Sequence, residues 1–216
     1  MKTYERLEAL REWTYEKVCK GKMMKAPAKD MDVSKVVRQE PQVFLAWFPT
    51  RPDEHGYSAE GPMSAAPSIL IMPCESYGKY IEVFRKNNYD VHRPQEMGQS
   101  LRCQLLFTVF EDGVRMPGFV DSAKTGKYDM SLIKEGTQDG LHTLLDWMDD
   151  FKESLLGQKV IPGTDLSLSE ASMTYGLYQN GEYVADKRPI YYGIVEVAFT
   201  CHADEKPNRD IARLLD

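Results

Sequence analysis

The sequence of 216 residues contains no long apolar run. Its longest apolar stretches, such as Val43 to Phe48 and Ile69 to Met72, are far shorter than the roughly 20 residues that a membrane-spanning helix requires. The N-terminal residues MKTYERLEALREW are charged throughout and lack the apolar centre of a secretory signal peptide. These absences predict a protein that does not enter a membrane and that resides by default in the cytoplasm.

Cysteine is sparse, and its spacing does not match a zinc site. The chain has four cysteines, far apart and with no C-x-x-C pair, at Cys19, Cys74, Cys103 and Cys201. All but Cys19 lie in or beside strand-like apolar runs, so we expect buried free thiols in a reducing compartment. An even count permits two disulfides, but nothing else in the sequence indicates secretion.

A basic charge balance is also missing. The formal net charge is −6, whereas proteins that grip nucleic-acid phosphates usually show a basic stripe or a basic balance. The basic clusters are small and are read as solvated surface charge: Lys17, Lys20, Lys22 and Lys25; Arg85 with Lys86; His92 with Arg93. We therefore expect no specific nucleic-acid binding.

No catalytic or ligand-binding motif stands out. There is no G-x-S-x-G elbow, and the segments GKYIEVF and TGKYDM lack the first glycine of a phosphate-binding loop. None of the four histidines, His55, His92, His142 and His202, has a second histidine or a cysteine at zinc spacing. The sequence thus predicts no catalytic, cofactor-binding or metal-binding residue, no cofactor, and a protein that is not an enzyme.

Some acidic residues do lie near histidines, but simpler roles explain them. Asp139 and Asp146 flank His142 at helical spacing, and we assign them to a helix start and to a charged helix face. Asp204 and Glu205 follow His202 in a polar tail. A possible Cys–His pair at Cys103 is disfavoured because that cysteine alternates with core residues. Asp149, Asp150 and Glu153 complete the charged outer face of the same helix.

What the sequence does contain is strong period-two patterning, which predicts strands. The clearest case is Arg188 to Cys201, in which Tyr191, Val195, Val197, Phe199 and Cys201 share one face. Leu101 to Phe110 is the second, with Leu101, Cys103, Leu105, Phe107 and Val109 on one face and a partly covered second face. Shorter strands are predicted at Val43 to Phe48, Ser68 to Met72 and Met173 to Tyr178, and within Tyr77 to Tyr89. Asn180-Gly181 is a type I′ hairpin signal.

Two helices are predicted from apolar residues at helical spacing. The first covers Thr3 to Lys20, with Thr3 as its cap and Gly21 at its end. Arg6 is predicted to lie on its polar surface. Its apolar face consists of Leu7, Leu10, Thr14 and Val18, with Trp13 beside them. The second covers Thr137 to Leu156 and ends at Gly157. Its stripe is Leu141, Leu144, Leu145, Met148, Phe151 and Leu155.

The remaining segments have loop composition: a connector at Lys22 to Pro41, a Pro-rich stretch at Pro49 to Pro67, Val114 to Gly136, and a polar tail from His202. We therefore predict an α+β fold, a mainly antiparallel sheet with helices packed on one face. Residues 1–216 form one domain with long loop insertions near 49–67 and 114–136. Its core is Leu105, Phe107, Val109, Leu141, Leu144, Leu145, Met148, Val195, Val197 and Phe199.

Tyrosine is concentrated around the C-terminal hairpin. Tyr175, Tyr178, Tyr183, Tyr191 and Tyr192 all lie there. Tyrosine favours protein interfaces, because its ring offers apolar area and its hydroxyl a hydrogen bond. It suits the half-exposed face of a sheet equally well, and the sequence leaves both interpretations open.

The order of these elements resembles the tail terminator, or tail completion, proteins of tailed bacteriophages and prophages. The elements compared are an N-terminal helix, PSILIM, RCQLLFTVF, GLHTLLDWMDDF and the closing RPIYYGIVEVAF. The resemblance covers most of the chain outside 49–67 and 114–136. It implies a structural virion assembly protein that forms a homo-oligomeric ring, caps the tail tube and joins it to the head. Its partners would be tail-tube and head-neck proteins, and it would pass from the bacterial cytoplasm into the virion tail.

Two other functions remain open. One is a small ligand-binding or enzymatic α+β domain with its site at the Pro-rich loop and the Tyr-rich hairpin. A pocket with converging polar groups would support this function. The other is a head–tail connector or another neck protein, which the sequence does not separate from a tail terminator. An open sheet edge with protruding loops would favour the ring-forming protein.

Overall fold

The computed structural model describes residues 1–27, 36–48, 50–53, 56–59, 65–73, 81–85, 97–111, 139–177, 179–180, 183–184 and 190–202. The loop predicted at 114–136, the turn at Asp112-Gly113 and the tail beyond His202 lie outside these residues. His55, His92 and Cys74 lie outside them as well.

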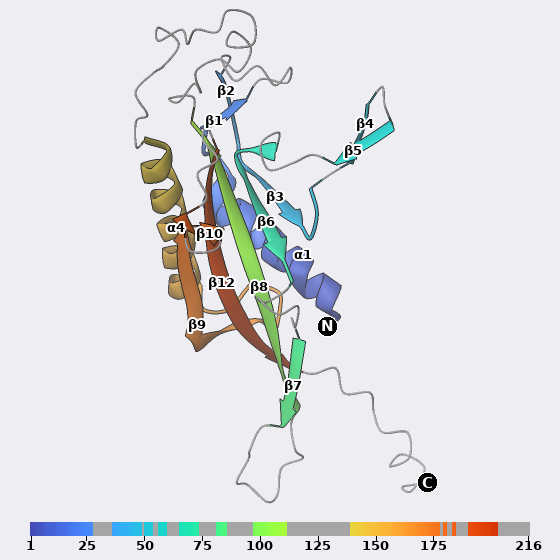
Figure 1. Cartoon of the computed structure of the whole chain (residues 1–216). Coiled ribbons are helices and arrows are strands. Elements are labelled where there is room, and N and C mark those ends of the chain that lie inside the picture. The colour runs from blue at the N-terminus through green and yellow to red at the C-terminus, as the bar shows by residue number, and fades with distance from the viewer. Residues whose placement is uncertain are drawn as a thin grey trace, which may run out of the picture.

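A six-stranded sheet forms the centre of the molecule (Figure 1). Its order is β3 (Gln42–Leu45), β6 (Ser68–Met72), β8 (Met97–Phe110), β12 (Ile190–His202) and β9 (Ser167–Leu177), with β7 (Ile81–Arg85) paired to one end of β8. Neighbouring strands are antiparallel, except that β3 and β6 are parallel. Together with the helices this confirms the predicted α+β fold.

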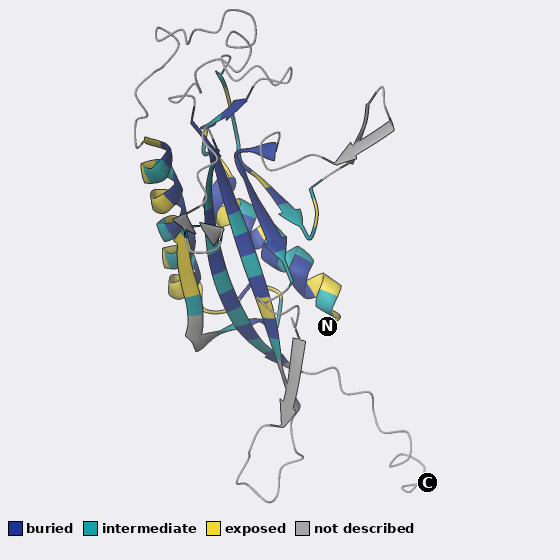
Figure 2. Cartoon of the chain, viewed as in Figure 1, coloured by how far each residue is buried: buried dark blue, intermediate teal, exposed yellow. Residues whose placement is uncertain are grey.

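The two longest strands, β8 and β12, pair along their whole length at the middle of the sheet. Val195 lies opposite Leu105, and Val197 opposite Cys103, so the apolar faces of both strands coincide. From Leu101 to Val109 in β8 and from Gly193 to Cys201 in β12, every second residue is buried on that face, and Figure 2 shows both strands largely in dark blue. The predicted one-sided burial of β12 is confirmed, and so is the partly covered second face of β8, on which Thr108 and Phe110 are buried as well.

Helices cover this same face of the sheet. They are α1 (Thr3–Thr14), a π-helical turn η1 (Tyr15–Cys19) and α4 (Asp139–Gln158). Their apolar residues and those of β6, β8 and β12 belong to one contiguous core cluster. Trp147 joins the layers, since its ring packs edge-on against Phe107 at 5.2 Å between centroids and its indole N–H donates to the Val18 carbonyl at 2.8 Å.

The first helix differs from the prediction at its ends and on one face. Lys2, not Thr3, is the N-cap, and the α-helix ends at Thr14, where a π-helical turn continues to Cys19. Gly21 does end the segment, with φ at +78°. Arg6, predicted on the polar surface, is only 1% exposed and packs within the fold.

The second helix extends further than predicted. It runs to Gln158, so Gly157 lies inside it, and the left-handed residue after it is Lys159, with φ at +58°. Leu145 was predicted in the core but is 37% exposed, and Leu141 is half-buried. Trp147 fills the core position instead, because it lies one turn after Leu144 on the buried face.

Four short strands lie where loops were predicted. The connector contains the hairpin β1 (Met24–Pro27) and β2 (Val36–Gln39), and the Pro-rich stretch contains β4 (Thr50–Asp53) and β5 (Gly56–Ala59). β1 is fixed to the main body by burial of Ala26 and by an ion pair between Lys25 and Glu111. The sequence reasoning missed these strands because each is four residues long and pairs with a neighbour in the chain.

Other boundaries shift by a few residues. β3 is shorter than predicted, because Ala46 turns the chain with φ at +61°. β9 begins at Ser167 rather than Met173. The predicted hairpin near Asn180 exists as β10 (Gln179–Asn180) and β11 (Tyr183–Val184), but Asn180 lies opposite Tyr183, so the two connecting residues are 181 and 182.

Candidate binding groove at the edge strand

The outer edge of β3 is open in the part of the chain that the structure describes, where β3 pairs with β6 alone. The Gln42 N–H donates to the Pro67 carbonyl at 3.3 Å, and the Ala46 N–H donates to the Ile71 carbonyl at 2.8 Å. Because N–H and C=O groups alternate in direction along a strand, those of Val43 point away from β6. The edge therefore presents backbone groups that another strand could pair with.

A cleft of about 460 Å³ lies along this edge, between β3 and the first helix. One wall is α1 with η1, and the other is the edge strand. The lining residues are Arg11, Glu12, Tyr15, Glu16, Gln42, Val43 and Phe44. The cleft combines an apolar floor, an open backbone edge and a charged wall.

Tyr15 is held in place at the wall of the cleft. Its hydroxyl donates to Glu40 Oε2 at 2.8 Å, and the Gly21 N–H donates to Glu40 Oε1 at 3.0 Å. The hydrogen bond from Tyr15, followed by that from Gly21, lowers the pKa of Glu40. The same Tyr15–Glu40 bond raises the pKa of Tyr15, so the phenol stays neutral and the carboxylate charged near neutral pH.

The charged wall is acidic on balance. Arg11 also lines the cleft and pairs with Glu8, with 2.8 Å between Nε and Oε2. Glu16 pairs with the exposed Lys20 at 2.8 Å. Glu12 is exposed and makes no ion pair among the described residues. Glu12 and Glu16 lie one helical turn apart on the same side of the helix.

Phe44 lines the cleft, and two further aromatic residues, Trp47 and Phe48, follow it just after the end of β3. The rings of Phe44 and Phe48 pack edge-on at 5.6 Å. Trp47, between them in the turn, is 82% exposed, whereas Trp13 and Trp147 are buried. An exposed tryptophan beside an open strand edge is unusual for a surface without a partner, since tryptophan is among the residues enriched in interface hot spots.

The residues considered for chemistry in the sequence are scattered. His142 is exposed on α4, and His202 is the last residue of β12. Cys19, Cys103 and Cys201 are buried and are not part of a disulfide, as predicted, and burial raises the pKa of Cys19 to about 12. In the described ranges no three His, Cys, Asp or Glu side chains gather as a metal site would require. Among the described helices, none is long and apolar enough to cross a membrane.

The acidic outer face of α4 behaves as a solvated surface. Asp149 pairs with Lys152 at 2.5 Å, and this hydrogen bond lowers the carboxyl pKa of Asp149. The Lys152 ammonium also lies 5.1 Å from the centre of the Tyr175 ring. Tyr175 is 48% exposed on the edge strand β9, while Tyr191 and Tyr192 are half-buried.

The cleft was missed in the sequence because its two walls are distant in the chain. Glu12 and Glu16 had been assigned to the polar surface of the first helix, which is correct but incomplete. The available signal was the short strand followed at once by Trp47 and Phe48. The ligand-binding alternative placed its site between the Pro-rich loop and the Tyr-rich hairpin. In the sequence these two segments come directly after strands at opposite edges of the sheet, since β4 follows β3 and β10 follows β9.

Comparisons with known proteins add no relative. No protein-family model matches the chain, and no curated protein matches it significantly. The resemblance to tail terminators therefore rests on the order of elements alone.

Proposed function

We propose that this protein is a structural virion assembly protein of the tail terminator or tail completion type. In this role copies of the chain form a ring that caps the tail tube and joins it to the head. The proposal includes the bacterial cytoplasm as the place of assembly and the virion tail as the final location. It assigns no catalytic residue and no cofactor.

The observation that supports it best is the pair of different surfaces at opposite edges of the sheet. β9 is the last strand at one edge, and among the described residues its outer side is open except at its start, where Ser167 pairs with Val160 and the Leu168 N–H donates to the Lys159 carbonyl at 2.7 Å. The opposite edge leads directly into β4 and β5, which pair only with each other among the described strands (Figure 1). A contact between this arm of one copy and the β9 edge of the next is heterologous, and such a contact closes into a ring when its rotation permits.

Electron microscopy of tails assembled with and without this protein tests the proposal. Without it, we expect tails of irregular length that fail to join heads. With it, tails should end at one fixed length. Tails of normal length that join heads equally well in its absence would refute the proposed function.

A matched variant links the test to the structure. Replacing residues 50–59 by a flexible linker of equal length removes the arm and leaves the six-stranded sheet intact. We expect this variant to unfold at the same denaturant concentration as the wild type but to form no ring. A variant that still assembles would show that the arm is not the contact.

A further inference from the structure

We propose that the groove between α1 and β3 binds an extended polypeptide strand in which basic and apolar residues alternate. The strand would belong to a partner protein and would add to the sheet beside β3. This inference goes beyond the assembly role and does not depend on it, because it concerns a surface that the proposed ring contact leaves open.

The backbone of β3 provides the first part of the argument. The Val43 N–H and C=O point away from β6 at the groove, and the Leu45 N–H points the same way further along the edge, while the Leu45 carbonyl accepts the Trp47 N–H at 2.6 Å. The open edge therefore ends after Leu45 and provides only a short row of main-chain hydrogen-bonding groups. Strand addition at an exposed edge obtains its affinity from such main-chain hydrogen bonds.

The side chains around the edge define the chemistry of the added strand. Val43 pairs with Ile69 on the helix-covered face, whereas Phe44 pairs with Leu70 on the opposite face. Successive residues of an added strand would therefore point in turn toward α1 and toward the face that carries Phe44. The α1 side presents Glu12 and Glu16 together with Arg11, whose charge is shared with Glu8, and the other side presents the Phe44 ring.

Charge decides which residues fit on the α1 side. The Glu12 carboxylate is exposed and makes no ion pair with any described residue. Glu16 shares its charge with Lys20 on an exposed surface, where such a pair contributes little. A lysine or arginine pointing toward these two carboxylates would form charge-assisted hydrogen bonds. An apolar residue pointing the other way would pack against Phe44, with Trp47 in the turn that follows β3.

The same charges favour a basic strand over a second copy as the occupant. A copy that extended the sheet through its β9 edge, with its helices on the same face, would bring its α4 beside α1. On the β9 side of α4 lie Lys152, whose ammonium is 5.1 Å from the centre of the Tyr175 ring, and its ion-pair partner Asp149, so this contact would bring no net charge to Glu12 and Glu16. A strand with alternating basic residues would instead place positive charge against both carboxylates, so we assign the groove to a basic strand from another protein.

Quenching of the Trp47 fluorescence can measure peptide binding. Trp47 is 82% exposed, while Trp13 and Trp147 are 6% and 2% exposed, so quenching by a soluble quencher reports mainly on the turn that follows β3, beside the groove. The probe is a short synthetic peptide of alternating Lys and Val residues. We expect it to protect Trp47 from iodide in a saturable manner, and to give no such signal with Trp47→Phe. A Glu–Val peptide and a backbone N-methylated Lys–Val peptide should not bind.

Variants of the charged wall test the electrostatic part. Glu12→Gln/Glu16→Gln should weaken binding of the Lys–Val peptide by about tenfold, the equivalent of one charge-assisted hydrogen bond. The matched control is Asp146→Asn/Glu153→Gln, which removes equal charge from the exposed face of α4 and should leave the affinity unchanged. Both double variants alter exposed side chains, so both should fold.

Each other outcome contradicts the proposal. Equal binding of the acidic and basic peptides, or equal effects of the two double variants, would remove the electrostatic argument. Binding of the N-methylated peptide would exclude strand addition. Protection of Trp47 that rises with protein concentration in the absence of peptide would assign the groove to a second copy. Loss of tail-length control, by contrast, tests the assembly role and leaves this result unaffected.

Discussion

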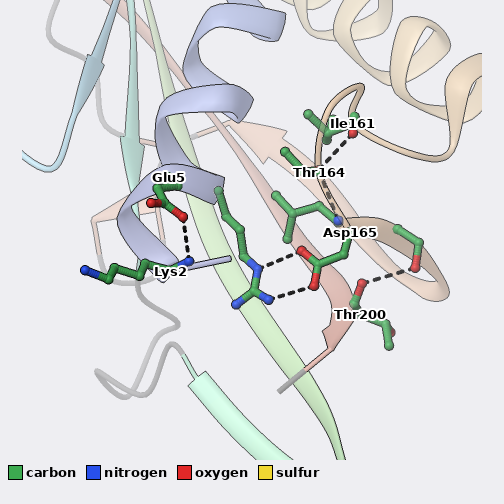
Figure 3. A network of polar contacts seen from close by, with 9 residues as sticks. Lys2, Glu5, Ile161, Thr164, Asp165 and Thr200 are labelled. Atoms are coloured by element: carbon green, nitrogen blue, oxygen red, sulfur yellow. Dashed lines mark hydrogen bonds and ion pairs between the residues drawn. The ribbon is translucent and has the colours of Figure 1, made fainter. Parts of the chain in front are cut away.

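Arg6 and Asp165 form a two-pronged ion pair that joins the first helix to the segment before β9. Arg6 Nε lies 2.8 Å from Asp165 Oδ1, and Nη2 lies 2.7 Å from Oδ2. The Arg6 side chain is 2% exposed and that of Asp165 22%. Figure 3 shows this pair and, beside it, a separate contact in which the Thr164 hydroxyl donates to the Ile161 carbonyl at 2.8 Å. A guanidinium this deeply buried requires its carboxylate, because an uncompensated buried charge is costly.

The first prediction follows from this pair. Asp165→Ala should lower the free energy of unfolding by about 3–5 kcal/mol, because it removes the carboxylate from a buried guanidinium. Glu16→Ala, which breaks the exposed pair with Lys20, should cost at most about 1 kcal/mol. Urea denaturation followed by circular dichroism measures both. Arg6→Met/Asp165→Leu should be more stable than Asp165→Ala, and equal losses in all three variants would contradict this account.

The predicted surface position of Arg6 was wrong because it was based on residue type. Position 6 lies one turn before Leu10 and two turns before Trp13, so its spacing belongs to the buried face. We predicted it at the surface because arginine is rarely buried without a partner. The partner, Asp165, lies 159 residues away in the sequence. No local pattern could reveal it.

The predictions that held were those with a local physical cause. The alternation in β8 and β12 and the helical spacing in α4 place apolar residues on one face, and this fixes the α+β fold. The pairing of segments that are distant in the sequence could not be predicted from local patterns, and the parallel β3–β6 contact is one example. The groove depends on that contact and on where α1 packs. Its residues were therefore visible in the sequence only as an ordinary helix surface and a short strand.

The second prediction contrasts two residues that were both expected in the core. Phe107 is fully buried and packs against Trp147 and Phe151, whereas Leu145 is 37% exposed. Phe107→Ala should lower the free energy of unfolding by about 3–5 kcal/mol. Leu145→Ala should change it by less than about 1 kcal/mol, since alanine keeps the helix and little burial is lost. Comparable losses in both would mean that α4 packs with a different face toward the sheet.

The third prediction concerns close packing between Gly193 and Met148. A Cβ at Gly193 would overlap the Met148 sulfur. Gly193→Ala should therefore cost about 1–3 kcal/mol by overpacking a full core. The matched control is Gly176→Ala in β9. A Cβ there would meet no atom within 4 Å, so we expect no loss of unfolding free energy.

A double-mutant cycle checks this cause. In Gly193→Ala/Met148→Ala the alanine methyl at 193 finds the space that the methionine vacates, so the double variant should lose less than the sum of the two single losses. Additive losses, or an equal loss at Gly176, would show that the glycine is needed for the backbone rather than for the methionine.

The last prediction is a dependence of stability on alkaline pH that arises from Cys19. Its side chain is fully buried, and burial raises its pKa from 9.0 to about 12. Lys22 opposes this shift and Glu40 adds to it. Below pH 9 the thiol is protonated in both the folded and the unfolded chain, so its contribution to stability does not vary there. Between pH 9 and about 12 the unfolded chain releases the proton first, and stability falls.

Comparing the wild type with Cys19→Ala isolates this effect from other titrating groups. The unfolding free energy of the wild type minus that of Cys19→Ala should be constant up to pH 9 and should decrease above it. The decline cannot exceed about 1.4 kcal/mol per pH unit, the slope for one proton. Urea denaturation in the presence of a reductant measures it. Parallel curves above pH 9 would mean that Cys19 ionises equally easily in both states and is not buried.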